Sequence, residues 1–188
     1  MENKTGKLFI LAGPSAGVGK TTLMRAILKE IPRLTRIPTA TTRTMREGET
    51  NAIDYFFISD TEFDSKIATG GLIEWIECAG YRYGTLRQPI EDYLKTGEPC
   101  LLVLEPRGVR SFRKIYPDLI SIFIMPPSFD ALRERMLARG RDTAEEIENK
   151  LTVAREEIKD KDQFDYIVLN DNFATAVAEI KKIIESRI

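Results

Sequence analysis

A glycine-rich stretch near the N-terminus has the composition of a loop that binds phosphate. It follows the apolar run 8–12 and precedes an amphipathic segment at 23–31. Glycines let backbone N–H groups wrap closely around phosphate oxygens, and a helix N-terminus adds partial positive charge. Lys20 would neutralise the outer phosphates, and the Thr21 hydroxyl would bind Mg²⁺. We predict phosphate contacts along the whole loop: Gly13, Pro14, Ser15, Ala16, Gly17, Val18, Gly19, Lys20, Thr21 and Thr22.

The spacing of this loop is irregular. Phosphate-binding loops usually have four residues between the first glycine and Gly-Lys. Here five residues separate Gly13 from Gly19, so one extra residue must bulge. The alternative interpretation of the stretch is an ordinary turn between a strand and a helix, with a Gly-Lys-Thr sequence that arose by chance.

Composition limits the classes of protein that the chain could belong to. Its 188 residues, 43% of them hydrophobic, are enough for one domain with a substantial core. A net charge of -1 argues against binding to nucleic acid or to an anionic membrane surface. We expect a cytoplasmic protein, because no run reaches the ~20 apolar residues of a membrane span and the N-terminus lacks a signal peptide.

The absence of histidine excludes several kinds of chemistry. Triads that use His, His-ligated metals and imidazole acid–base catalysis all require this residue. Phosphoryl transfer is not excluded, because it depends mainly on positioning and on charge neutralisation. Cys78 and Cys100 form no CxxC pair, and we expect both to be small core residues.

Apolar runs alternate with amphipathic segments along the chain, which predicts an α/β fold with a parallel sheet. A capping box at 85–88 is expected to begin one helix, and a second at 143–146 to begin another. The expected strands are 8–12, 54–58, 72–77, 101–104, 120–124 and 166–169, and the expected helices are 23–31, 61–69, 85–97, 128–139, 143–159 and 174–188.

Residues 39–49 are rich in Thr and Arg and have little apolar periodicity, which indicates a functional loop. Arg43 and Arg46 could form charge-assisted, bidentate hydrogen bonds to a phosphate, and Tyr55 could donate another. A solvated basic loop is the alternative interpretation of this segment.

Taken together, the phosphate loop, residues 39–49 and the arginine-bearing helix at 128–139 resemble the guanylate kinase family. The resemblance covers about 7–184, with the motifs in the same order. It implies transfer of a phosphoryl group from Mg·ATP to GMP by a single domain with the P-loop kinase fold, an α/β three-layer parallel sheet core. The implied parts of residues 1–188 are a core at 1–35, 98–127 and 159–188, a GMP-binding region at 36–97 and a helical lid at 128–158.

The same resemblance implies how GMP is recognised. Glu74 would accept hydrogen bonds from N1 and N2 of guanine, whereas the N1 acceptor of adenine would be repelled. Considered alone, Glu74 would be a surface carboxylate on a strand. Thr39 would supply a hydroxyl for the O6 and N7 side of the base. The implied GMP-binding residues are Thr39, Arg43, Arg46, Glu49, Tyr55, Glu74, Tyr83, Gly84 and Thr85.

Arg135 and Arg139 lie four residues apart, on one face of a helix, and match arginines of the family's lid. Without that context such a pair is usually a solvated helix face. The resemblance implies that both arginines, with Lys20 and Arg43, act in catalysis by neutralising charge that develops during transfer.

Two further matches concern ATP and its metal ion. Asn170 and Asp171 resemble the family's loop beside adenine, although the same dipeptide is an ordinary turn signal. Glu105 follows an apolar strand and would hold Mg²⁺ together with Thr21.

Other positions depart from the family's pattern. The family's Asp-x-Asp reads Val103 and Glu105 here, Lys150 stands for a third arginine, and Pro106-Arg107 replaces a Val-Gln type of pair. Two alternatives therefore stay open: a kinase of this fold with another acceptor, or a non-catalytic guanylate-kinase-like binding module. The expected partners are ATP and GMP, with no nucleic acid or membrane, for a monomer or homodimer.

Overall fold

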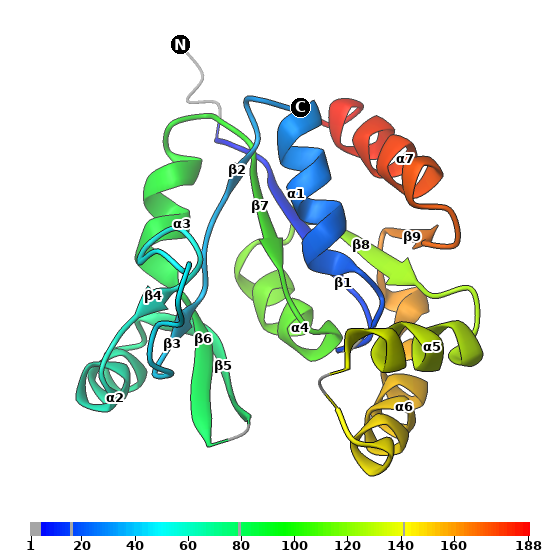
Figure 1. Ribbon diagram of the computed structural model, residues 1–188. Coiled ribbons are helices and arrows are strands. Elements are labelled where there is room, and N and C mark those ends of the chain that lie inside the picture. The colour runs from blue at the N-terminus through cyan, green and yellow to red at the C-terminus, as the bar shows by residue number, and fades with distance from the viewer. Residues whose placement is uncertain (1–4, 16, 79, 141) are drawn as a thin grey trace.

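The computed structural model describes residues 5–15, 17–78, 80–140 and 142–188, which adopt the expected α/β fold (Figure 1). Ala16, one of the predicted phosphate contacts, lies outside the described residues. The main sheet is parallel, in the order β2-β7-β1-β8-β9. Its strands are β1 (Leu8–Ala12), β2 (Thr35–Arg36), β7 (Cys100–Val103), β8 (Ile120–Met125) and β9 (Tyr166–Leu169).

The central strand β1 is buried on both faces, as its unbroken apolar sequence predicts. Phe9 and Leu11 belong to one hydrophobic cluster, and Leu8 and Ile10 belong to the other. Because successive strand residues point to opposite faces, β1 contributes to both halves of the core.

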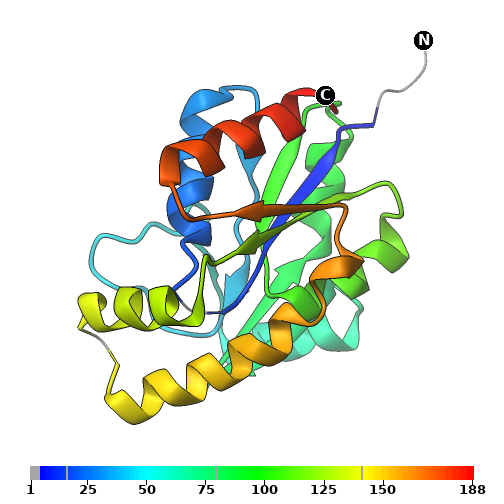
Figure 2. The same ribbon diagram turned by 90° about the vertical axis from the view of Figure 1, so that its right-hand side faces the viewer.

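Helices cover both faces of this sheet (Figures 1 and 2). The helices α1 (Lys20–Glu30) and α7 (Phe173–Glu185) pack against each other on one face, and α3 (Arg87–Leu94) and α4 (Pro106–Ile115) lie on the other. The three layers confirm the predicted core. No helix in the described part of the chain has the length and apolar character needed to cross a membrane.

A second sheet, which the sequence did not predict, has the strand order β4-β3-β6-β5. The expected strand at 54–58 is reduced to two residues, and the helix expected at 61–69 is α2. This sheet is mixed, since β3 pairs in parallel with β4 and antiparallel with β6. The elements are β3 (Ala40–Thr41), β4 (Phe56–Phe57), α2 (Asp60–Ala68), β5 (Leu72–Cys78) and β6 (Tyr81–Leu86).

The predicted capping box at 85–88 is wrong. Thr85 belongs to strand β6, and α3 begins at Arg87 without a side-chain cap. The Thr85 hydroxyl instead donates to Oε1 of Glu74, at 2.5 Å. A half-buried carboxylate on the neighbouring strand therefore accepts a hydrogen bond from the hydroxyl that the local sequence assigns to a helix end.

The sequence defines the two helices of the predicted lid, α5 (Phe129–Arg139) and α6 (Ala144–Ile158), almost to the residue. Ser128 caps α5, whose C-cap Gly140 has a φ of 61°. Thr143 and Glu146 form the predicted capping box of α6. A short 3₁₀ turn, Lys161–Gln163, then leads to β9.

Helix α4 was not predicted, although its sequence carries a start signal. Pro106 occupies the first turn, where its missing N–H is not needed. Val109 and Phe112, three apart, bury its apolar face in the core. Charged residues beside them, including Arg110 and Arg113, obscure this pattern.

The turn before β4 contains two residues with left-handed backbone. Gly48 has a φ of 80° and Ala52 a φ of 61°. Left-handed backbone costs a residue with a side chain roughly 1–2 kcal/mol, while glycine loses more entropy on folding, by roughly 0.5–1 kcal/mol. The backbone of Ala52 is therefore strained, and a glycine at this position would relieve that strain.

We expect Ala52→Gly to raise the free energy of unfolding by about 0.5–1 kcal/mol, and Gly48→Ala to lower it by about 1 kcal/mol. A methyl group on Gly48 would meet no atom within 4 Å, so this loss would be conformational rather than steric. Urea unfolding at unchanged m-value measures both. A lower midpoint for Ala52→Gly would contradict the assignment of strain.

Candidate active site

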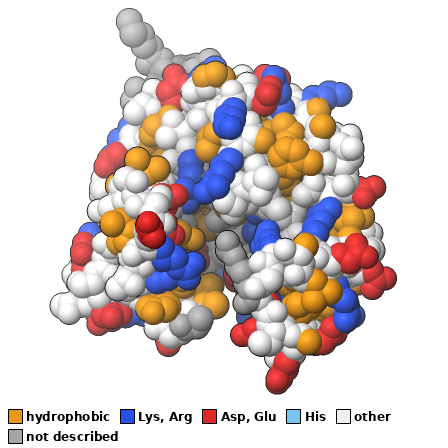
Figure 3. Space-filling model, viewed as in Figure 1, with side chains coloured by type: hydrophobic (Ala, Val, Ile, Leu, Met, Phe, Trp, Pro, Cys, Tyr) orange, Lys and Arg blue, Asp and Glu red, His pale blue; other side chains and the backbone are white. Residues whose placement is uncertain are grey.

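The predicted site residues gather at the carboxyl edge of the parallel sheet. Gly13 follows β1, Glu105 follows the last pairs of β7, and Asn170 follows β9. Open α/β sheets bind ligands in the crevice at this edge. The space-filling view shows Lys and Arg side chains around the hollow between the second sheet and the lid helices (Figure 3).

Glycines shape the phosphate loop for physical reasons. A Cβ atom on Gly13 would lie 2.6 Å from the carbonyl oxygen of Ile124 in β8. Gly19 has a φ of 88°, and a Cβ there would lie 2.8 Å from Nδ2 of Asn170. The loop is therefore pressed against the sheet edge at both ends, which only glycine permits.

Lys20, at the first turn of α1, folds back over the loop. Its Nζ donates to the carbonyl oxygens of Gly13 at 2.8 Å and Pro14 at 2.6 Å. Burial lowers the pKa of Lys20 to about 8, while the negative charges of Glu105 and Glu157 oppose this shift. The ammonium group is thus partly shielded from water by the loop, and it lines both the groove beside the loop and the cavity beside Glu105.

Asn170 has a larger role than a turn residue. Its side chain is buried, and Nδ2 donates to the carbonyl oxygen of Val18 at 2.8 Å. The backbone carbonyl oxygen of Asn170 accepts a hydrogen bond from Nη2 of Arg135, at 2.9 Å. Asn170 therefore joins β9, the phosphate loop and α5, whereas the neighbouring Asp171 is exposed.

The two predicted lid arginines have different surroundings. Arg139 lines a narrow groove of about 80 Å³ with the described loop residues Pro14, Ser15, Gly17, Val18, Gly19, Lys20, Thr21 and Thr22. Arg135 instead contacts Asn170. Lys150, which stands where an arginine was expected, donates to Asp142 at 2.5 Å within the lid. We call the groove beside Arg139 the donor groove.

A larger cavity, of about 350 Å³, lies between the main sheet and the second sheet. We call it the acceptor cavity. Five of the residues that we predicted to bind GMP line this cavity. Ser15, Lys20 and Glu105, which lie at the edge of the main sheet, line it as well. Those five are Thr39, Tyr55, Glu74, Tyr83 and Gly84.

Glu74 presents a half-buried carboxylate to this cavity. Burial raises the pKa of Glu74, the hydrogen bond from Thr85 opposes the shift, and the charge of Glu105 adds to it. Gly84 opposite has no room for a side chain, since a Cβ would lie 2.9 Å from the carbonyl oxygen of Glu74. The carboxylate is desolvated and held in place, so hydrogen-bond donors from a ligand would stabilise its charged form.

Arg43, which follows β3, is a buried cation that lies near Tyr55 of the acceptor cavity but does not itself line that cavity. Its two Nη atoms donate to the carboxylate of Glu49 at 2.8 and 3.0 Å, and this lowers the pKa of Glu49. The guanidinium carbon lies 5.6 Å from the ring centroids of both Tyr55 and Phe57. Arg46 contributes its backbone N–H to Glu49 at 2.8 Å, while its side chain is exposed.

The residues predicted to hold a metal ion line different spaces. Thr21 lines the donor groove and a polar cavity of about 340 Å³, whose lining also includes Thr39 and Tyr55. Glu105 lines the acceptor cavity. Val103 borders both the polar cavity and the acceptor cavity, where the family's pattern would have a carboxylate.

Sequence analysis missed several residues of the site. Cys78 is exposed and lines the acceptor cavity, so its expected place in the core is wrong, whereas Cys100 is buried as expected. Arg107 was not missed: it was already noted as a departure from the family's pattern, and it lines the same cavity. Glu157 contacts the phosphate loop from a point 142 residues later in the chain, which no local signal could reveal.

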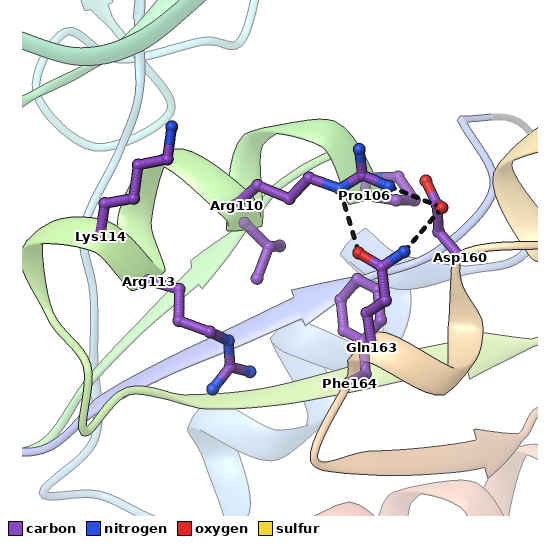
Figure 4. Close-up of a pocket in the computed structure, with 8 residues that line it drawn as sticks. Pro106, Arg110, Arg113, Lys114, Asp160, Gln163 and Phe164 are labelled. Carbon is purple, nitrogen blue, oxygen red and sulfur yellow. Dashed lines mark hydrogen bonds and ion pairs between the residues drawn. The ribbon is translucent and has the colours of Figure 1, made fainter.

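One cavity lies outside all of these predicted residues. Figure 4 shows it between α4 and the turn that follows α6, with a volume of about 290 Å³. Arg110 crosses it to Asp160 at 2.7 Å and to Gln163 at 3.0 Å. These contacts link the turn that follows α6 to α4.

Comparison with known proteins agrees with this geometry. The family model described as "Guanylate kinase" matches residues 5–187. The chain belongs to the guanylate kinase family. A guanylate kinase from Prochlorococcus marinus is 44% identical over 99% of this chain and 100% of its own length. One from Symbiobacterium thermophilum is 42% identical, over 98% of this chain and 87% of its own length.

A solved structure extends the match to the fold. The crystal structure of guanylate kinase from Anaplasma phagocytophilum superposes with a TM-score of 0.76, at 28% identity. The match covers 97% of this chain and 86% of the other. Both the sequence and the fold of a guanylate kinase therefore extend along almost the whole chain.

The pKa of Lys20 predicts how nucleotide binding depends on pH. An ammonium group with a pKa of about 8 loses its charge as the pH rises through 8, and bound phosphates would favour the charged form. Without Mg²⁺, we expect the affinity for ADP to be constant near pH 7 and to fall by up to about tenfold per pH unit above 8.

Isothermal titration in EDTA between pH 7 and 9.5 measures this dependence, because phosphates are almost fully ionised throughout. Lys20→Arg is the control, since its guanidinium stays charged and its profile should be flatter. Identical profiles for the two proteins would show that Lys20 does not titrate in this range.

Proposed function

We propose that the chain transfers the γ-phosphoryl group of ATP to GMP and releases ADP and GDP. It is an enzyme of the guanylate kinase family, whose sequence pattern it matches from residue 5 to 187. The observation that carries the assignment is the acceptor cavity, where Glu74 and Tyr83 face Lys20 of the phosphate loop. A base-binding carboxylate and a phosphate-binding lysine share one space, as transfer between two nucleotides requires.

On the donor side, the phosphate loop would hold ATP through its backbone N–H groups. Lys20 would leave the carbonyl oxygens of Gly13 and Pro14 and bind the outer phosphates. Arg139, already in the donor groove, and Arg135, one helical turn earlier, would neutralise charge on the group in transfer. Asn170 and Asp171 would border the adenine side.

The site fits Mg²⁺ as ATP normally carries it. In the part of the chain that the structure describes, no group of three or more His, Cys, Asp or Glu is placed to hold a metal. Mg²⁺ does not need one, since it keeps several waters and binds phosphates with one or two protein oxygens. Thr21 and Glu105 offer such oxygens, and the bound ion would neutralise charge on the phosphates.

On the acceptor side, Glu74 would accept the N1 and N2 hydrogens of guanine. The Thr85 hydroxyl, which already donates to Oε1 of Glu74, supports this orientation. Thr39 would meet the O6 and N7 side, and Gly84 would leave room for the base. Adenine offers an acceptor where Glu74 needs a donor, so it would leave a buried carboxylate unpaired.

The GMP phosphate would lie against Arg43, with Arg46, Tyr55 and Tyr83 as further donors. Because Glu49 holds both Nη atoms of Arg43 before substrate arrives, the guanidinium needs little reorganisation. The acceptor phosphate is already anionic, so no protein base is needed for its attack on the γ-phosphorus.

The chain would work as one domain of three parts. Residues 1–35, 98–127 and 159–188 would form the core, 36–97 the GMP-binding region and 128–158 the lid. Closure of the last two over the substrates would exclude water and limit hydrolysis of ATP. We expect a monomer or homodimer that acts in the cytoplasm, where ATP and GMP are available.

The first test is GDP formation from GMP with ATP and Mg²⁺, with dGMP, AMP, CMP, UMP and TMP as parallel acceptors. We expect turnover only with GMP and dGMP, and a loss of kcat of about 10²–10³-fold in Lys20→Ala. Equal turnover with another acceptor would favour a kinase of different specificity. GMP binding without any turnover would favour a binding module.

Glu74→Gln tests guanine selection separately. The amide donates where the carboxylate accepted, so kcat/KM for GMP should fall by about 10–100-fold and the preference for GMP over AMP should shrink. Glu77→Gln is the matched control, because Glu77 is exposed on the other face of β5. An unchanged ratio of GMP to AMP in Glu74→Gln would rule out this role.

A further inference from the structure

Glu157, in the last turn of α6, is a buried carboxylate with two partners in the phosphate loop. Only 6% of its surface is exposed. Its Oε2 accepts the backbone N–H of Ser15 at 2.9 Å, and its Oε1 accepts the Ser15 hydroxyl at 2.5 Å. Among the described residues it is the one carboxylate in the set of buried polar side chains. Burying a carboxylate is costly unless hydrogen bonds compensate, so this contact is a built part of the fold.

Ser15 lies where the two substrate spaces meet. It lines the donor groove and also the acceptor cavity. A shift of Ser15 would therefore change the wall between the donor phosphates and the acceptor. Transfer rates are sensitive to such shifts, because a displacement of about 1 Å can cost about 10²-fold.

The end of α6 that carries Glu157 is fixed on its other sides as well. Leu151 and Ala154 are buried in the hydrophobic cluster that also contains Val18 of the loop. Beyond the helix, Arg110 of α4 holds Asp160, as Figure 4 shows. Glu157 thus projects from an anchored helix end rather than from a mobile one.

We propose that Glu157 is a positioning residue for phosphoryl transfer, which fixes Ser15 at the junction of the donor groove and the acceptor cavity and so links the lid's second helix to the phosphate loop. This inference rests on the proposed function. It predicts that Glu157 affects the rate of transfer more than the binding of GMP, since its contacts are with the loop and not with the residues around Glu74.

The test compares steady-state kinetics of Glu157→Ala, Glu157→Gln and Ser15→Ala with those of the wild type. We expect Glu157→Ala to lower kcat by about 10–100-fold, with KM for GMP within about twofold. Glu157→Gln keeps the shape and one acceptor oxygen, so it should recover part of this loss. Glu156→Gln is the control, because Glu156 is exposed and pairs with Lys159.

A double variant tests the link itself. If Glu157 acts through Ser15, adding Ser15→Ala to Glu157→Ala should cause little further loss, because coupled residues are not additive. If Glu157→Ala does not fold, the double-mutant cycle is made with Glu157→Gln instead. We expect Ser15→Ala to fold, because Ser15 is exposed.

The outcomes separate the two hypotheses. If the wild type is active and kcat of both Glu157→Gln and Ser15→Ala stays within twofold of the wild-type value, the positioning role is overturned and the proposed function is left intact. Losses that multiply in the double variant, or a KM for GMP that rises as much as kcat falls, would also overturn it. An inactive wild type with every acceptor would overturn both.

Discussion

The site is organised around one half-buried ammonium group, that of Lys20. Desolvation of a charge is expensive, and the fold offsets the cost with loop carbonyl oxygens and with carboxylates from two other elements. Glu105 precedes α4 and Glu157 lies in the last turn of α6, so the loop, the sheet edge and α6 all place groups near the same charge. In the proposed function, a phosphate chain would meet a cation that is already partly desolvated, where electrostatic attraction is stronger than in water.

The acceptor half follows the same rule with the charges reversed along the cavity. Glu74 is a half-buried carboxylate that lines the acceptor cavity, and Arg43 is a buried cation near Tyr55 of that cavity. Each is fixed by a partner, Thr85 or Glu49, before substrate arrives. Val103 lines two of the cavities, so an apolar side chain stands where the family's pattern has a carboxylate. The arrangement fits the proposed recognition of a ligand that has hydrogen-bond donors at one end and an anionic group at the other.

Local patterns predicted what depends on local physics, and failed where distant contacts decide. The caps at Ser128 and Thr143 and the buried strand β1 follow from a few adjacent residues. The capping box predicted at Thr85 was wrong because the Thr85 hydroxyl donates a hydrogen bond to Glu74 on the neighbouring strand. The contact of Glu157 with Ser15 could not be predicted, because no periodicity relates residues so far apart in the chain. The loop and the acceptor residues were found only because their combination, rather than any one of them, resembles a family.

The position of β1 in the sheet also governs how the chain reaches this state. Leu8 pairs with Cys100 and Phe9 with Ile120, so β1 has no neighbouring strand in the sheet until Cys100 has been synthesised. At about 5–20 residues per second, that wait lasts on the order of 5–20 s. During this time five consecutive apolar residues have no sheet to join. The topology of the sheet therefore leaves a short hydrophobic segment without its native partners during synthesis.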